Sequence, residues 1–235
     1  ILDGGARSGI IFSTAGGVTG SFSANRLSEL QRRLITAFAA RAPGFFLTGG
    51  AVLCGFELGH RRTDDLDFFT IDDEAMAEGE RALRAAAAEI GAGLESVLSA
   101  PDHHRFVARV GDEAVLVDLV RDRVVQLREK VDRGGVRTDP VEEIVANKIC
   151  ALVGRSEIRD LVDLFALEGA GYRVEDFLDD AAKKDGGATP ATIAWLLSTL
   201  AIPDTLPSGF DPRALREFAA DLERRMRKRA APASD

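Results

Sequence analysis

The sequence has few of the residues that define disulfide-rich, zinc-binding or membrane proteins. Cys54 and Cys150 are its only cysteines and form no C-x-x-C pair, so we expect two reduced, buried thiols in a cytoplasmic protein. A structural zinc site needs about four nitrogen or sulfur ligands at regular spacing, and His60, His103 and His104 supply no such set. We expect the adjacent histidines to lie on a solvated strand or loop. No run of about 18 apolar residues occurs, so no membrane-spanning helix is expected.

The balance of charge argues against a protein that coats nucleic acid. The 38 acidic residues exceed the 30 lysines and arginines and give a net charge of -8. This charge disfavours bulk attraction to a polyanion but is compatible with a local basic groove. Hydrophobic residues make up 46% of the chain and charged residues 29%, which is typical of a folded globular protein. The 235 residues suit one large or two small domains.

The chain divides by composition into three parts. Residues 1–23 are rich in glycine and serine and lack the features of a signal peptide or a P-loop, so we treat them as a poorly defined N-terminal segment. Residues 24–138 alternate between strand and helix patterns, beginning with a helix capped by Asn25, whereas residues 139–235 contain helix patterns alone. We therefore predict an α/β (α+β) fold, in which a small mixed sheet flanked by helices precedes a C-terminal helical domain.

Apolar runs and turn residues define the elements of the α/β part. The run that ends in Gly49-Gly50 predicts a buried strand followed by a tight turn. Alternation around Gly111-Asp112 predicts a β-hairpin. The expected elements are a strand at 45–48, a helix at 51–56, a strand at 66–69, a helix at 74–90 and a hairpin at 103–122.

The helical part is expected to begin with a clearly marked helix. Asp139 can cap it, Pro140 suits its first position, and Glu142 and Glu143 lie where the helix dipole favours anions. We expect the basic end of the last helix to be solvated. The expected helices lie at 140–153, 157–168, 174–183, 190–200 and 212–229.

Asp65 and Asp67 are the strongest chemical signal in the sequence. Residues i and i+2 of a strand point to the same face, so the two carboxylates should converge while Leu66 points into the core. Two ionised carboxylates this close repel unless a cation or a proton lies between them. Magnesium prefers such oxygen ligands and completes its shell with substrate phosphates. The alternative is a pair of turn aspartates at the end of a strand.

Two further features fit a phosphate and metal site around this pair. Backbone N–H groups at the Gly49-Gly50 turn, directly before a helix, can bind a phosphate with no side chain in the way. Asp118 is a third acid in an otherwise apolar strand, where a buried charge needs a reason. Asp118 either binds a metal ion or forms a salt bridge with Arg121 or Arg123.

Lys148 lies on the apolar stripe of the first helix in the second part. Such a lysine is costly unless it meets an anion, so it either binds triphosphate oxygens or packs its stem while its ammonium reaches water. Asp160 and Asp163 share a face of the next helix. Either one of them orients Lys148 or activates an acceptor hydroxyl as a base, or both pair with Arg155 and Arg159 on the helix surface.

These motifs together resemble one family. The stretches that carry the resemblance are GGAVL at 49–53, GHRRTDDLDFF at 59–69, EEIVANKI at 142–149 and RDLVDL at 159–164. They resemble the signature of the AbiEii/AbiGii toxin-type nucleotidyltransferases, the MenT-like branch of the polymerase-β-like superfamily, over residues 26–170. Many members of the superfamily have Gly-Ser where this chain has Gly49-Gly50, so a hydroxyl of Thr48 or Thr63 would have to replace the serine.

The resemblance implies transfer of a nucleoside monophosphate from a nucleoside triphosphate to an acceptor. It implies magnesium, or manganese in its place, as the cofactor, held by Asp65, Asp67 and Asp118. The catalytic residues it implies are Asp65, Asp67, Asp118, Lys148 and Asp160, and the nucleotide-binding residues are Gly49, Gly50, Arg61, Thr63, Lys148 and Asp163. Arg61 and Arg62 either contact the phosphate or the acceptor, or are ordinary surface arginines.

The resemblance also points to tRNA or a protein as the acceptor and to a cognate antitoxin as a partner. Two other functions stay open on the sequence. One is a small-molecule nucleotidyltransferase of the aminoglycoside-modifying type, which a screen of acceptors would identify. The other is a catalytically silent protein that binds a nucleotide or a partner, which triphosphate would stabilise without turnover.

Overall fold

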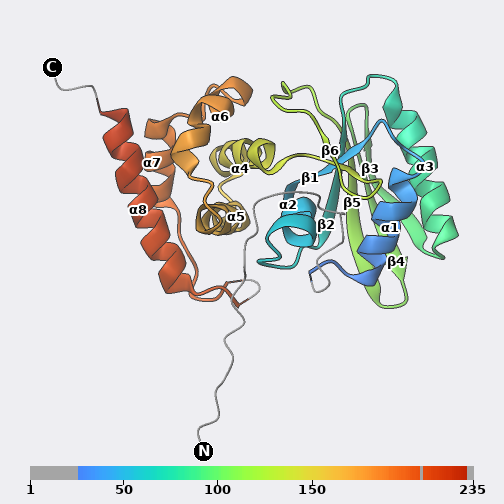
Figure 1. Ribbon diagram of the computed structural model, residues 1–235. Coiled ribbons are helices and arrows are strands. Elements are labelled where there is room, and N and C mark those ends of the chain that lie inside the picture. The colour runs from blue at the N-terminus through green and yellow to red at the C-terminus, as the bar shows by residue number, and fades with distance from the viewer. Residues whose placement is uncertain (1–25, 207–208, 232–235) are drawn as a thin grey trace, which may run out of the picture.

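The computed structural model describes residues 26–206 and 209–231, and one mixed β-sheet runs through the first half of the chain (Figure 1). Asn25 lies outside the described residues, so its expected role as a helix cap is untested. The strands of the sheet are β1 (Phe46–Thr48), β2 (Asp65–Thr70), β3 (Gly93–Ala100), β4 (His103–Val110), β5 (Glu113–Arg121), β6 (Val131–Asp132) and β7 (Arg137–Thr138).

The strand order places β2 in the middle of the sheet. Across the sheet the order is β3-β4-β5-β2-β1-β7-β6, and β2 is antiparallel to β1 and parallel to β5. β4 and β5 form the predicted hairpin around Gly111-Asp112. Because β2 and β5 are parallel neighbours, Asp67 lies directly opposite Asp118 in the register. Two acids that are distant in the sequence are thus side by side on the sheet.

Two helices cover one face of the sheet. α1 (Glu29–Ala39) and α3 (Ala75–Glu89) contact each other and β5. Along β2, buried residues alternate with half-buried ones. Leu66 and Phe68 are buried, and the Phe68 ring packs on Phe38 of α1, so Asp65 and Asp67 point to the opposite face. The strand uses one side for the core and leaves the other for its carboxylates.

Helices alone follow the last strand. In Figure 1 they lie to the left of the sheet, with α8 along their outer side. They are α4 (Val141–Arg155), α5 (Ile158–Gly169), the 3-10 turn η2 (Val174–Phe177), α6 (Leu178–Lys184), α7 (Pro190–Thr199) and α8 (Pro212–Ala230). α4 contacts α5, α6 and α7, and it also contacts α2 (Gly49–Val52). α2 follows β1 directly and continues into a π-helical turn, η1 (Leu53–Glu57).

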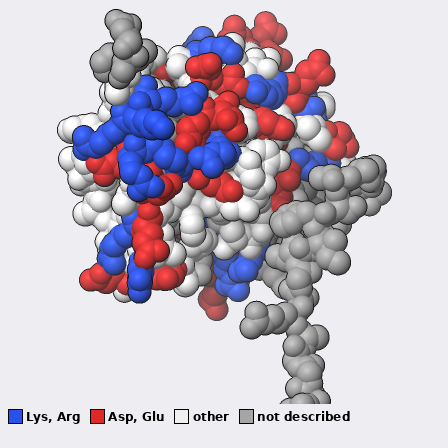
Figure 2. All heavy atoms as spheres, turned by 60° about the vertical axis from the view of Figure 1, so that its left-hand side comes forward, with Lys and Arg blue, Asp and Glu red and all other residues white. Residues whose placement is uncertain are grey.

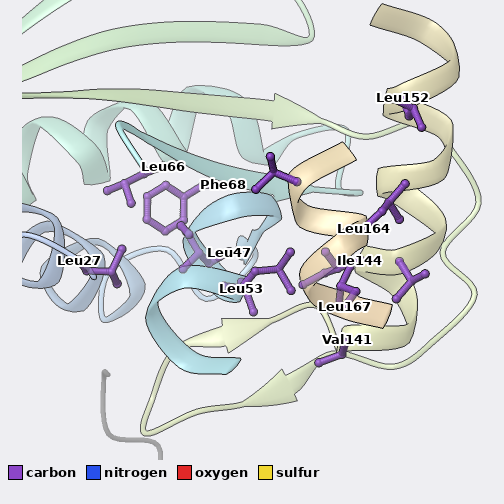
Figure 3. Close-up of a cluster of buried hydrophobic side chains, with 14 of the residues drawn as sticks. Leu27, Leu47, Leu53, Leu66, Phe68, Val141, Ile144, Leu152, Leu164 and Leu167 are labelled. Carbon is purple, nitrogen blue, oxygen red and sulfur yellow. The ribbon is translucent and has the colours of Figure 1, made fainter. Parts of the chain in front are cut away.

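The sheet and the later helices share one hydrophobic core. Figure 3 shows Leu47 and Phe68 of the sheet in one cluster with Leu53 of η1 and with Val141 and Ile144 of α4. Each large aliphatic or aromatic side chain that is fully buried contributes about 1.5–3 kcal/mol. Apolar packing therefore holds α4 against the sheet.

The predicted mixed α/β fold is confirmed, with differences at the ends and edges of elements. α1 begins at Glu29 and is capped by Ser28, which forms a reciprocal capping box with Gln31. The sequence does not predict β3, because this edge strand is exposed on both faces and has no regular apolar alternation. β6 and β7 are too short to leave a pattern. No helix in the described ranges is long and apolar enough to cross a membrane.

The prediction that Asp139 caps α4 is wrong. Pro140 occupies the N-cap position instead. The Asp139 carboxylate accepts hydrogen bonds from Thr48 Oγ1 and Lys130 Nζ, each at 2.5 Å. A charged lysine is a stronger partner than a backbone N–H at a helix end, so the acid ties β1 to the segment before β6. The expected acidic first turn, with Glu142 and Glu143, is present.

The basic end of the sequence forms the last turns of α8. Figure 2 shows lysine and arginine side chains gathered there with acidic side chains among them. Arg227 pairs with Glu223, and Lys228 and Arg229 are exposed. This end of the helix is a solvated surface of mixed charge, as predicted.

Candidate active site

Asp65 and Asp67 lie on the face of β2 that turns away from α1 and α3. Within the described chain, neither carboxylate oxygen of Asp67 accepts a hydrogen bond. Burial, followed by repulsion from Asp65, raises the pKa of Asp67 to about 7. A cation at this position would relieve both the burial cost and the repulsion.

Gly49 and Gly50 leave room for the side chains around this acid. A Cβ at Gly49 would lie 2.8 Å from Oδ2 of Asp67, and a Cβ at Gly50 would lie 2.9 Å from Nη2 of Arg61 and 3.0 Å from Oγ1 of Thr63. Gly49 also has a φ of 65°, in the left-handed region that favours glycine. Close packing thus requires both glycines, whether or not their N–H groups contact a phosphate.

Asp65 has partners from its own loop and from α5. Thr63 Oγ1 donates to Oδ1 at 2.5 Å, and Arg159 Nη1 donates to Oδ2 at 3.0 Å. The Thr48 hydroxyl likewise donates to Asp139. Because both threonine hydroxyls donate to carboxylates, neither is available in this arrangement to replace the missing serine.

Asp118 is engaged by two cationic or titratable side chains from β4. Nε and Nη2 of Arg105 donate to its two oxygens at 2.8 and 2.9 Å, and His103 Nε2 lies 2.7 Å from Oδ1. Burial disfavours the charged carboxylate, but these partners outweigh burial and lower the pKa of Asp118. Asp118 is therefore an ionised, paired carboxylate beside Asp67.

The partners of Asp118 differ from those considered on the sequence. Arg121 and Arg123 pair with Asp102 instead. His103, expected on a solvated surface, is half-buried because Asp118 draws it against the sheet.

Lys148 lies on the buried stripe of α4, as predicted, and is only 5% exposed. Its Nζ lies 3.0 Å from Oδ1 of Asp160 and 2.7 Å from Oδ2 of Asp163, and both aspartates are fully buried on α5. Burial alone would lower the pKa of Lys148, but Asp163 and Asp160 outweigh burial and raise it. The ammonium is charged and bridges two carboxylates, so its partner is an anion and not bulk water.

Each of these aspartates has further partners. Nε and Nη2 of Arg61 hold Asp163 at 2.7 and 2.8 Å, and His60 Nε2 lies 2.7 Å from it. Nε and Nη2 of Arg155 hold Asp160, also at 2.7 and 2.8 Å. Burial opposes ionisation, but the cations around each carboxylate outweigh burial and lower both pKa values. Neither aspartate is suited to accept a proton near neutral pH.

Two hollows open beside the carboxylates. The first, which we call the central cleft, has a volume of about 600 Å³ and lies between the sheet and α4, with Gly49, Asp67 and Lys148 in its wall. The second, which we call the arginine groove, has a volume of about 590 Å³ and includes Asp65. The arginines that line this groove are Arg26, Arg61, Arg62 and Arg159.

The hollows divide the predicted site residues into three groups. The residues that line the central cleft are Gly49, Asp67 and Lys148. Those that line the arginine groove are Arg61, Thr63 and Asp65. Those that line neither are Gly50, Asp118, Asp160 and Asp163. Arg61 and Asp163, both predicted to bind nucleotide, are paired with each other, so the structure does not bring them to the central cleft.

Arg105 was not predicted as a partner of Asp118, and Arg155 was predicted only as a helix-surface partner of the α5 aspartates, although the sequence contains a signal for each. A two-residue turn at Gly111-Asp112 pairs residues equally distant from it, which places Arg105 opposite Asp118. Arg155 is seven positions after Lys148, so two helical turns bring both to one side of α4.

The aspartates of β2 and β5 do not form a ready three-ligand metal site. In residues 26–206 and 209–231, no group of three or more His, Cys, Asp or Glu side chains is placed to hold a metal ion. The carboxylate oxygens of Asp118 are hydrogen-bonded to Arg105 and His103, and those of Asp65 to Thr63 and Arg159. A metal ion would have to share these oxygens or displace the partners.

Comparison with known proteins identifies the fold and the family. Residues 33–233 match the family described as nucleotidyl transferase AbiEii toxin, type IV TA system. The Helicobacter pylori protein JHP933 shares the fold at 21% identity and a TM-score of 0.53, with 86% of this chain and 92% of that chain covered. A second H. pylori structure, described provisionally as a nucleotidyltransferase, has 20% identity and a TM-score of 0.54, with 88% of this chain and 100% of that chain covered. No curated protein matches. Because the family match spans most of the sequence, the chain belongs to the AbiEii nucleotidyltransferase toxins of type IV toxin–antitoxin systems.

Proposed function

We propose that this protein transfers a nucleoside monophosphate from a nucleoside triphosphate to an acceptor hydroxyl, with the help of a divalent metal ion. The central cleft carries the proposal. β2 presents Asp67, α2 presents Gly49 and α4 presents Lys148 to one space of about 600 Å³, which is within the usual range for small-molecule sites. A carboxylate on one wall and a lysine on the other suit a metal-bound triphosphate between them.

Asp65 and Asp67 are the residues we assign to the metal ion. Their carboxylates share one face of β2, and the raised pKa of Asp67 reflects burial and repulsion that a cation would relieve. Magnesium, or manganese in its place, suits oxygen donors, and one or two carboxylates with substrate phosphates commonly suffice. The bound ion would neutralise charge on the triphosphate. Asp118 would join this pair by sharing an oxygen now held by Arg105.

Asp160 and Asp163 act as positioning residues in this proposal. A general base works best with a pKa near the working pH, whereas the cations around both acids lower their pKa values. Their contacts instead hold the ammonium of Lys148 at the wall of the central cleft. Of the two site roles considered for Asp160, orientation of Lys148 is therefore the one we propose.

The acceptor would approach through the arginine groove, next to Asp65. Four arginines against Asp64 and Asp65 give the lining a net charge of +2 (4 − 2), although the whole chain carries -8. Arg26 and Arg62 are exposed there. Arginines are the usual contacts of nucleic-acid phosphates, so this lining favours RNA, such as tRNA, over a protein as the acceptor. The family assignment implies a cognate antitoxin as a further partner.

The proposed transfer is a displacement at the α-phosphorus. The acceptor oxygen bonds to this phosphorus, the bond to the oxygen bridging the α- and β-phosphates breaks, and pyrophosphate leaves with that oxygen. The acceptor proton passes to solvent. Lys148 and the backbone N–H of Gly49 would offset the negative charge that develops on the leaving pyrophosphate.

Incubation of the protein with each common α-labelled nucleoside triphosphate, magnesium, and either total tRNA or cell lysate tests the proposal. We expect label in one macromolecular fraction, and its loss when EDTA removes the metal. A parallel arm with aminoglycosides tests a small-molecule acceptor. Triphosphate binding with no label in any arm would contradict the proposal and favour a silent nucleotide-binding protein.

A further inference from the structure

Three lysine or arginine side chains from the described residues line the central cleft: Lys148, Arg155 and Lys184. A triphosphate is strongly anionic, and its phosphates need cationic contacts. The three side chains differ in their exposed fraction and in how many N–H donors remain free after their ion pairs and hydrogen bonds within the protein are counted.

Lys184 is committed to a structural role. Its side chain is 2% exposed, and its Nζ lies 2.5 Å from Oε1 of Glu143 and donates to the carbonyl oxygen of Val125 at 2.9 Å. Glu143 is fully buried, so withdrawal of Lys184 would leave a buried carboxylate without its ion pair. Lys184 is therefore expected to keep its ion pair with Glu143 and not to contact a ligand.

Lys148 is also largely committed. Its side chain is 7% exposed and its single positive charge is shared by Asp160 and Asp163. It can present one N–H to a phosphate, but its charge is already compensated within the protein. Lys148 alone leaves most of the charge on a triphosphate without a partner.

Arg155 differs from both because its guanidinium has an unused edge. Its side chain is 43% exposed. Nε and Nη2 donate to Asp160, and Nε also lies 3.8 Å from Oε2 of Glu157, whereas Nη1 makes no hydrogen bond within the described chain. A guanidinium carries five N–H donors in a fixed plane, so Arg155 can keep its bidentate contact with Asp160 and still donate to a phosphate oxygen. Asp160 thereby sets the plane in which the free donors point.

We propose that Arg155 is a direct ligand of the triphosphate in the central cleft, and that Asp160 is the positioning residue that orients it. This inference rests on the proposed function, because it requires a triphosphate in that cleft. Asp160 then holds two side chains of α4, Lys148 in the middle of the helix and Arg155 at its last position.

Calorimetric binding without an acceptor tests this inference in the presence of magnesium. The probes are the common nucleoside triphosphates, their monophosphates and inorganic tripolyphosphate. Arg155→Met should weaken binding of nucleoside triphosphate and tripolyphosphate about tenfold or more, since it removes a hydrogen bond between a charged donor and a charged acceptor. Binding of the monophosphate should change much less, because a purely structural role would weaken both ligands alike.

Arg128→Met is the matched control, because Arg128 also pairs with an aspartate, Asp180, and is 33% exposed, but it does not line the cleft. It should leave all affinities unchanged. Arg155→Lys keeps a charge but loses the planar fork, so its triphosphate affinity should be intermediate; it also serves if Arg155→Met does not fold. Wild-type affinity in the folded Arg155 variants would overturn the inference alone. Failure of the wild type to bind any triphosphate would overturn the proposed function as well.

Discussion

Single residues in this site differ mainly in whether their charge has a partner. Three of the aspartates each have at least two basic side chains as partners. Asp118 is held by Arg105 and His103, Asp160 by Lys148 and Arg155, and Asp163 by Arg61 and His60. Asp67 accepts none within the described chain, and its pKa is raised to about 7. Asp67 lines the central cleft, where burial and the neighbouring Asp65 disfavour its charged form. Asp67 is thus the acid whose charged form a bound metal ion would stabilise most.

Asp67→Asn is expected to abolish transfer and leave the fold intact. Loss of a metal ligand removes several kcal/mol of transition-state stabilisation, or about a thousandfold in rate. Stability should change little, because the loss of repulsion with Asp65 offsets the lost contacts. Rates of label transfer and the midpoint of thermal unfolding measure the two effects. Asp112→Asn, at the exposed hairpin turn, is the control, and a mutant rate within a few-fold of the wild type would remove the metal assignment.

Lys148→Met is expected to weaken both triphosphate binding and stability. On the sequence alone we expect stability to change little or even to rise, because methionine keeps most of the packing of the stem. The structure reverses this expectation, since Lys148 bridges two fully buried aspartates. Breaking a buried ion pair costs about 3 kcal/mol at the low end of the usual range, and Arg61 and Arg155 still hold the two acids. Denaturant unfolding measures the cost, and an unchanged free energy of unfolding would show that the bridge contributes nothing to the fold.

The β4–β5 hairpin shows how one element supplies both an acid and its partner. Its tight turn fixes the register, which places Arg105 opposite Asp118 on the open face of the sheet. Register with β2 then places Asp118 beside Asp67. The position of Asp118 therefore depends on the hairpin turn and on strand pairing together.

Arg105→Met is expected to destabilise the protein by about 1–3 kcal/mol, because it leaves the buried Asp118 carboxylate with His103 alone. Arg109→Met is the matched control on the same strand and face. Arg109 is exposed, so its loss should cost less than about 0.5 kcal/mol. Chemical denaturation measures both variants, and equal costs would mean that Arg105 contributes no more to stability than a surface arginine.

Strong periodic patterns made most helices and the central strands predictable. The apolar stripe around Lys148 and the i, i+2 spacing of Asp65 and Asp67 are local, so sequence alone places these side chains on their elements. The ion pairs of Lys148 and Asp118 join different elements, and their partners depend on packing between helices and on strand register. β3 was missed for a different reason: a doubly exposed edge strand buries no face and leaves no alternation.

At the scale of the whole molecule, the sheet and the later helices share a core and the central cleft lies between them. The division near residue 138 stays a prediction about domains. The shared core favours one cooperative unit, because α4 buries its apolar stripe partly against α2.

Leu53→Ala tests that unit. Leu53 is fully buried in the shared core, and such a truncation costs about 2–5 kcal/mol. Native-state hydrogen exchange should show the same loss of protection for amides of β2 and of α4. Leu98→Ala, on the exposed edge strand, should change neither. A loss confined to the sheet would show that the two parts unfold separately.

Nucleotidyl transfer from a triphosphate bound between Asp67 and Lys148 requires the α- and γ-phosphates to reach different products. The wild type and Asp67→Asn are incubated in parallel with α-labelled and γ-labelled triphosphate, magnesium and total tRNA or lysate. Nucleotidyl transfer predicts α-label on the acceptor and γ-label in pyrophosphate alone, with both signals lost in Asp67→Asn. Transfer of γ-label to the acceptor, or undiminished α-label transfer by Asp67→Asn, would contradict it.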